Sequence, residues 1–141
     1  MEELIILITG AIAGMAAYAI SIILGKGAVF GSAIVVLLSG FFLPHIFGDL
    51  GTDMAVIATT ASYAGMVATK NVPKLLDMAM VGLVCGILYI PTADVFAGVG
   101  GRLGTIAAIA CLFWMGVRKA YFMLASNQAN AKTGKTMDRM Q

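Results

Sequence analysis

Few side chains of this 141-residue chain could do chemistry, and the densest set surrounds its single histidine. His45, Asp49 and Asp53 recur at intervals of four, which would place them on one face of a helix and could suit a metal ion. Pro44 precedes that stretch, Gly48 and Gly51 lie within it, and both residue types disfavour a regular helix. We therefore expect a solvated loop and no metal site.

Sequence motifs of enzymes are missing from the chain. It has one histidine, no paired metal-ligand motif and no phosphate-binding glycine loop followed by lysine. The glycine cluster of residues 98–101 lacks the soluble strand that precedes such glycines in a dinucleotide fold. Cys85 and Cys111 lie inside apolar stretches, where a packing role is the simplest interpretation. The sequence predicts a protein that is not an enzyme, with no catalytic residue and no cofactor.

A phrase that the chain uses twice is its most distinctive feature. Residues 48–52 read Gly-Asp-Leu-Gly-Thr, and residues 101–105 read Gly-Arg-Leu-Gly-Thr. Each copy follows an apolar run that we expect Pro44 or Pro91 to end. Thr52 and Thr105 could cap the next helix by accepting a bond from an unpaired N–H group. The repeat suggests a duplicated helical hairpin with a binding site at its loops, and two ordinary external turns are the alternative.

Three charged side chains carry further expectations. Asp49 and Arg102 occupy the same place in the two copies with opposite charge. We expect them either to form an ion pair between the two hairpins or to be solvated separately. Asp77 lies one turn after Lys74 at the edge of an apolar run, so a local pair or a side chain reaching the interface is favoured over a proton relay.

The amino-acid composition indicates whether the chain folds in water or in a membrane. The chain is 60% hydrophobic and 11% charged, with a mean hydropathy of +0.96, which is too apolar for a soluble globular domain. A net charge of +2 gives no support for a nucleic-acid partner. The sequence predicts an all-α integral membrane protein whose main partner is the lipid bilayer.

Five apolar runs predict five transmembrane helices, one at the N-terminus and two sequence-related hairpins in a parallel repeat. The predicted spans cover residues 4–24, 28–43, 54–69, 75–90 and 103–124, and the hairpins cover residues 26–70 and 74–119. The last four spans are short, and those of 16 residues would be about 24 Å long. Residues 1–125 would form one transmembrane domain, and residues 126–141 a polar cytoplasmic tail.

Charges between the spans predict the orientation. The basic loop residues fall on one side of the five-span arrangement, except Arg102. Most of the acidic residues fall on the other side. By the positive-inside rule the N-terminus lies outside and the C-terminus is cytoplasmic, and we expect a prokaryotic cell membrane.

Two functional classes fit these features. The first is an oligomeric transporter or channel for a small solute, with its path near the repeated loops. Its candidate pathway residues are Gly48, Asp49, Gly51, Thr52, Thr59, Ser62, Gly101, Arg102, Gly104 and Thr105. The second is a non-catalytic subunit of a larger membrane complex, which would use small-residue faces for packing. The candidate packing residues are Gly10, Gly14, Gly82 and Gly86. Partners would be further copies of the chain or other membrane subunits.

Overall fold

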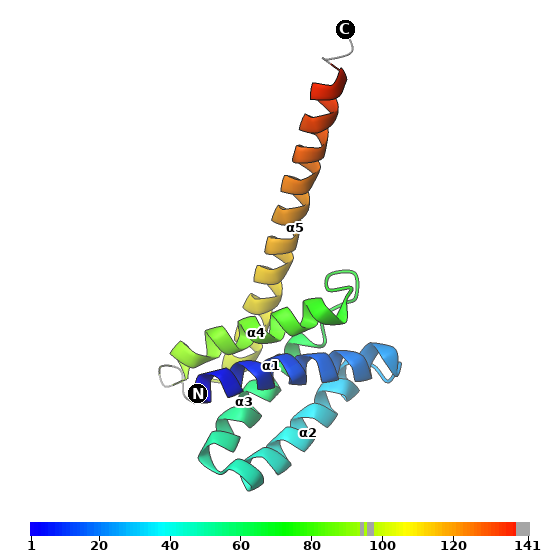
Figure 1. Cartoon of the computed structure of the whole chain (residues 1–141). Coiled ribbons are helices and arrows are strands. Elements are labelled where there is room, and N and C mark those ends of the chain that lie inside the picture. The colour runs from blue at the N-terminus through cyan, green and yellow to red at the C-terminus, as the bar shows by residue number, and fades with distance from the viewer. Residues whose placement is uncertain (94, 96–97, 138–141) are drawn as a thin grey trace.

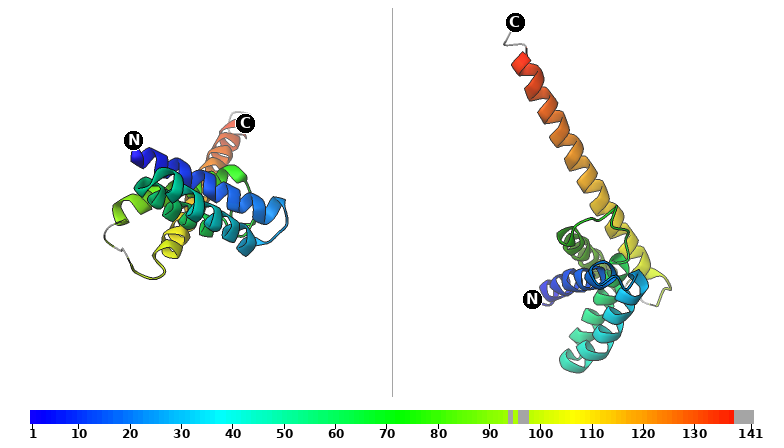
Figure 2. Two further views of the ribbon diagram at one scale, coloured as in Figure 1. Left: turned by 90° about the horizontal axis from the view of Figure 1, so that it is seen from below. Right: turned by 90° about the vertical axis from the view of Figure 1, so that its right-hand side faces the viewer.

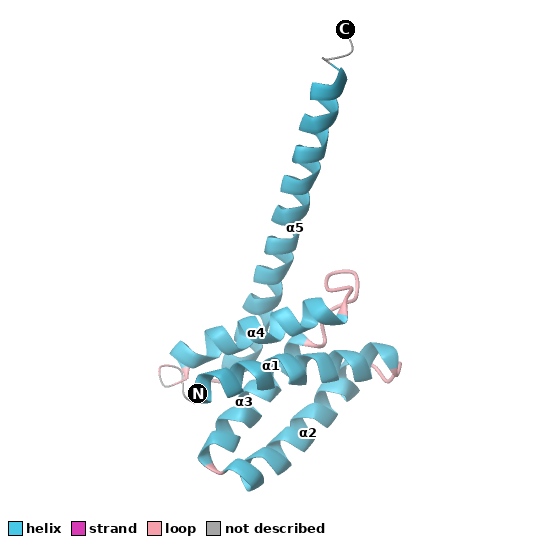
Figure 3. Cartoon of the chain, viewed as in Figure 1, coloured by secondary structure: helices cyan, strands magenta, loops and turns pink. Residues whose placement is uncertain are grey.

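The chain forms helices alone over the residues that the computed structural model describes, which are 1–93, 95 and 98–137. The helices are α1 (Glu2–Tyr18) with a π-helical turn η1 (Ala19–Ile23), α2 (Ala28–Phe47), α3 (Asp49–Ala64), α4 (Leu75–Thr92) and α5 (Arg102–Met137). Figure 3 shows these helices joined by loops. The predicted all-α class is confirmed.

Four helical stretches of the described chain are long and apolar enough to cross a membrane. They cover Glu2–Ile23, Ala28–Ala64, Leu75–Thr92 and Arg102–Ser126. Many large apolar side chains point outward, such as Phe41 and Leu112, which are 71% and 66% exposed. This surface fits a protein embedded in lipid. A helix lies in each of the five predicted ranges, although α3 ends at Ala64, five residues before the predicted end. Five spans are not confirmed, because α2 and α3 form one apolar stretch that breaks at Gly48.

The helices run in several directions rather than in one parallel bundle. Figures 1 and 2 show α1 and α4 side by side and antiparallel, while α2 and α3 form a separate hairpin. Helix α5 crosses α4 steeply and continues well beyond the other helices. Its 36 residues correspond to about 54 Å at 1.5 Å per residue. The predicted tail is therefore helical as far as Met137, and residues 138–141 lie outside the described part.

Glycines bring α1 and α4 into backbone contact. A Cβ atom added at Gly10 would lie 2.8 Å from the carbonyl oxygen of Gly82, and one added at Gly86 would lie 2.8 Å from Cδ2 of Leu7. Gly14 lies in the same interface, where an added Cβ would make an ordinary contact with Met78 at 3.4 Å. The four candidate packing glycines thus lie where α1 meets its neighbours, and this close approach needs residues without bulky side chains.

The two predicted hairpins differ in shape. Gly48 alone joins α2 to α3, whereas a longer loop joins α4 to α5, which cross rather than lie along each other. The hairpin repeat is therefore not confirmed. Pro44 and Pro91 lie inside α2 and α4, which continue to Phe47 and Thr92, beyond the predicted span ends at residues 43 and 90. After Pro44, the helix can continue because the Gly48 N–H still reaches the proline's carbonyl oxygen at 3.0 Å.

Candidate functional site

The repeated phrase has the same backbone conformation in both copies. Gly48 and Gly101 have φ angles of +61° and +82°, in the region that favours glycine, and a helix begins at the next residue. The N–H groups of Thr52 and Thr105 then bond to the carbonyl oxygens of Gly48 and Gly101, at 3.1 and 2.9 Å. The phrase therefore encodes a sharp change of direction followed at once by a helix.

The two threonines do not cap these helices as predicted. The Thr52 hydroxyl donates to the Gly48 carbonyl oxygen at 3.4 Å, and the Thr105 hydroxyl donates to that of Gly101 at 3.1 Å. Both threonines lie in the first turn, because α3 begins at Asp49 rather than at residue 54 and α5 begins at Arg102. A threonine inside a helix turns its hydroxyl back to the carbonyl four residues earlier, which explains the reversed role.

The two copies of the phrase differ in how their second glycine is packed. A Cβ atom added at Gly51 would overlap the Leu43 carbonyl group of α2, so this glycine permits the tight α2–α3 hairpin. A Cβ atom added at Gly104 would have no atom within 4 Å. The two equivalent glycines thus have the same local backbone but opposite surroundings.

The predicted ion pair between Asp49 and Arg102 is not formed. Arg102 instead donates from Nη1 to the Ala93 carbonyl oxygen at 3.0 Å, and its Cζ lies 5.2 Å from the centre of the Tyr89 ring. The Tyr89 hydroxyl donates to Oδ1 of Asp53 at 3.1 Å. We call Asp53, Tyr89 and Arg102 the Arg102 cluster. The cluster connects the two copies of the phrase, because Arg102 belongs to the second copy and Asp53 directly follows the first. Asp53 lies one helical turn after Asp49, the residue that was expected to pair with Arg102.

Two nitrogens of Arg102 have no hydrogen-bond partner among the described residues. Nε and Nη2 are buried and make no hydrogen bond within the described part of the chain. A buried charged donor without an acceptor is costly, so these two nitrogens are destabilising unless a partner reaches them. From the sequence, Arg102 is a candidate pathway residue, the expected partner of Asp49 and the exception to the charge pattern, but nothing in the sequence points to Tyr89 or Ala93 as its neighbours.

A second polar cluster lies further along α5. Arg118 approaches Asp77 of α4 with 3.5 Å between Nη1 and Oδ2, and the same nitrogen donates to the Asn71 carbonyl oxygen at 3.1 Å. Nearby, the buried Tyr18 hydroxyl donates to the Val72 carbonyl oxygen at 2.5 Å. The expected pair between Lys74 and Asp77 is not formed, because the crossing of α4 and α5 supplies a cation that lies far away in the sequence.

Thr59 and Ser62, the candidate pathway residues in the second half of α3, use their hydroxyl groups for hydrogen bonds within the protein. Ser62 is fully buried, with its hydroxyl 2.7 Å from the Thr59 carbonyl oxygen and 2.9 Å from the Ser32 hydroxyl. The Thr59 hydroxyl donates to the Ala55 carbonyl oxygen at 2.8 Å. Ser62 lies thirteen positions, or about 20 Å of helix, after Asp49 at the start of α3. The structure does not bring these hydroxyls together with the repeated phrase.

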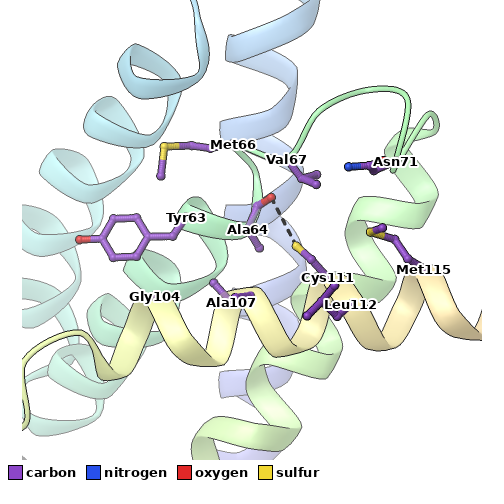
Figure 4. Close-up of a pocket in the computed structure, with 11 residues that line it drawn as sticks. Tyr63, Ala64, Met66, Val67, Asn71, Gly104, Ala107, Cys111, Leu112 and Met115 are labelled. Carbon is purple, nitrogen blue, oxygen red and sulfur yellow. Dashed lines mark hydrogen bonds between the residues drawn. The ribbon is translucent and has the colours of Figure 1, made fainter.

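An apolar groove runs between the end of α3, the loop that follows it, and α5. Figure 4 shows its residues, with Tyr63 to Asn71 on one side and Gly104 to Met115 of α5 on the other. Its volume is about 690 Å³. The Cys111 thiol of α5 donates to the Ala64 carbonyl oxygen of α3 at 3.9 Å and so connects the two sides. We call it the α3–α5 groove. Gly104, Ala107 and Ala108 give its α5 wall a low profile.

No set of three histidine, cysteine or acidic side chains in the described residues is placed to hold a metal ion. His45 lies in the last turn of α2, while Asp49 and Asp53 belong to α3 beyond the turn at Gly48. The expected solvated loop at this point is wrong, because all but Gly48 is helical. Comparisons with protein families, with curated proteins and with solved structures found no match.

Proposed function

We propose that the protein is a non-catalytic integral membrane subunit whose α3–α5 groove receives a transmembrane helix from another copy or from another membrane protein. The observation that carries this proposal is the open space at Gly104. At the α1–α4 contact, Gly10 and Gly82 are already covered by a neighbouring helix. Gly104 has the same small profile without a neighbour, which is the surface that membrane helices use for close association.

The dimensions of the groove support a helical occupant. Its α5 wall extends from Gly104 to Met115, which is about 17 Å along the axis or three helical turns. Gly104 and Ala108 are four residues apart and share one face, so they form a small-xxx-small surface. Tyr63 and Met66 form the opposite rim and are 38% and 37% exposed. An incoming helix would bury these side chains and contact the α5 backbone.

The proposed topology keeps the expectations drawn from the sequence. Five spans would cross a prokaryotic cell membrane, with the N-terminus outside and the C-terminal part of α5 inside; because α4 and α5 cross steeply, at least one of them would be strongly tilted in the membrane. Arg102 and Arg118 support this arrangement for α5, because no charged residue lies between them and they are about 24 Å apart along the helix. The matching turns at Gly48 and Gly101 support a parallel duplication.

An oligomeric transporter or channel is the second candidate. The Arg102 cluster favours it, because two unpartnered N–H groups beside the repeated phrase would suit a charged solute. The pathway would then lie between copies, where α3 and α5 meet a neighbouring subunit. Flux of a small anion into liposomes, lowered by Arg102→Gln and absent from empty liposomes, would favour this candidate over a purely structural subunit.

The groove proposal is tested by Gly104→Leu with Gly116→Leu as its matched control. Both glycines are exposed in α5, and a Cβ atom added at either has no atom within 4 Å. The two substitutions therefore have similar local consequences, but only Gly104 lines the groove. We expect Gly104→Leu to convert the assembly purified in mild detergent to single chains, while Gly116→Leu keeps it intact.

Native mass spectrometry of the purified protein measures this difference directly. Repeated copies in the wild-type spectrum identify a homo-oligomer, and a foreign chain in fixed ratio identifies a hetero-complex. If Gly104→Leu assembles like both the wild type and Gly116→Leu, the groove is not an assembly surface. Circular dichroism of both variants verifies that their helix content is unchanged.

A further inference from the structure

A second pocket lies on a different face of α5, beside the Arg102 cluster. Its volume is about 250 Å³, below the roughly 300–1,000 Å³ of pockets for drug-sized ligands. Arg102 lines it at the start of α5, and Ile106 and Ile109 line it about one and two turns further along; Thr92, Val99, Gly100 and Thr105 complete the described lining. The pocket therefore has one cationic end and one apolar end.

We propose that this pocket binds an anionic phospholipid, with the phosphate on the Arg102 guanidinium and an acyl chain along Ile106 and Ile109. The buried Nε and Nη2 atoms of Arg102 lack a hydrogen-bond acceptor in the described part of the chain. Both atoms are shielded from solvent, so a phosphate in the pocket would reach them once the side chain turns toward it; two adjacent N–H groups of one guanidinium then match two oxygens of a phosphate. A bound phosphate would satisfy both donors and neutralise the charge.

Among the described residues, the other polar groups near Arg102 are already engaged. Its Nη1 donates to the Ala93 carbonyl oxygen, and Tyr89 directs its hydroxyl to Asp53. The Asp53 carboxylate thus reaches Tyr89 and makes no ion pair with Arg102. The Thr105 hydroxyl lines the pocket but donates to the Gly101 carbonyl oxygen. The guanidinium is therefore the donor that an anion would meet, and the start of α5 adds the positive end of the helix dipole.

The position of Arg102 favours a lipid over a free anion. Arg102 is the first residue of α5, at one end of its apolar stretch, which is where the headgroups lie if α5 spans the bilayer. Ile109 is 49% exposed two turns further along the helix, so the apolar end of the pocket opens toward the lipid side. A phosphate held at Arg102 would carry its acyl chain along this face.

The test measures lipid binding to the full-length protein in an uncharged detergent by native mass spectrometry. The probes are phosphatidylglycerol, diacylglycerol and inorganic phosphate, which supply phosphate with chains, chains alone and phosphate alone. We expect tight binding of phosphatidylglycerol only. Arg102→Gln should weaken it by about tenfold or more, because charge-assisted hydrogen bonds are lost. Lys119→Gln, which removes an exposed charge from the same helix, should leave it unchanged.

A second variant keeps the test valid if Arg102→Gln fails to fold. Ile109→Trp retains the guanidinium and fills the apolar end of the pocket, so it should also weaken phosphatidylglycerol binding. Unchanged binding in either folded variant overturns the proposal. Equal binding of diacylglycerol overturns the role of the phosphate, and binding of inorganic phosphate alone overturns the lipid assignment. The outcome is independent of the α3–α5 groove, which lies on another face of α5.

Discussion

Replacing glycines at the α1–α4 contact by alanine should destabilise the protein in an order fixed by what each new methyl group meets. At Gly10 the methyl carbon would lie 2.8 Å from the Gly82 carbonyl oxygen. Reaching an ordinary contact of 3.4 Å requires the two backbones to move apart by about 0.6 Å. At Gly82 the new methyl group would overlap the backbone of Gly10 and Ala11 more severely.

The magnitude follows from the packing that such a shift would disrupt. A gap of 0.5–1 Å forfeits roughly a quarter to a half of each dispersion contact along the interface. We therefore expect Gly10→Ala to cost about 1–2 kcal/mol and Gly82→Ala about 2–3 kcal/mol, the range typical of overpacked cores. At Gly86 the methyl group first meets the flexible end of Leu7, so Gly86→Ala should cost less than about 1 kcal/mol.

The free energy of unfolding is measured by SDS titration of the detergent-solubilised protein, followed by circular dichroism. Gly116→Ala is the control, because that exposed site is open and alanine is the better helix former. The double variant Gly10→Ala/Gly82→Ala should cost less than the sum of the single variants, since one separation of α1 and α4 accommodates both methyl groups. If Gly82→Ala is as stable as Gly116→Ala, the backbone contact does not exist.

Two further predictions concern the polar contacts at the other end of the bundle. Tyr18→Phe should lower the free energy of unfolding by about 1–3 kcal/mol in the same assay, because it leaves the buried Val72 carbonyl oxygen without its donor; a change below that of Gly116→Ala would contradict this. Arg118→Gln should destabilise the protein by about 1–3 kcal/mol, since it removes the partner of Asp77, which is only 15% exposed. Lys119→Gln should have little effect, and equal losses from both variants would show that the Asp77 contact is unimportant.

The sequence predicts the helices well because membrane helices have strong local signals. Apolar runs separated by glycine, lysine and proline mark all five helical ranges, and helix ends shift by only a few residues at most boundaries. The start of α3 is the largest error at a helix start. It begins at Asp49 because Gly48 alone makes the turn, so the segment up to Asp53 is helical rather than a loop.

Contacts between helices are harder to predict, because each depends on a crossing that no single segment encodes. Asp77 lies one turn from Lys74, yet it pairs with Arg118 from α5. Arg102 shares a repeat position with Asp49, yet it meets Tyr89 and Ala93 instead. In both cases the expected partner is the nearest opposite charge in the sequence or in the repeat. The observed partner is a different group, which the steep crossing of α4 and α5 brings closer.

The repeated phrase illustrates how one local signal can serve two different surfaces. Gly48 and Gly101 require glycine for the same reason, a positive φ angle immediately before a helix. The second glycine of each copy has no such requirement, and its role depends on its neighbours: Gly51 is covered by α2, whereas Gly104 is open. The difference arises because α2 folds back directly on α3, while α4 crosses α5 and leaves the equivalent face bare. An uncovered copy of a helix-packing surface is the physical basis for placing a partner helix at Gly104.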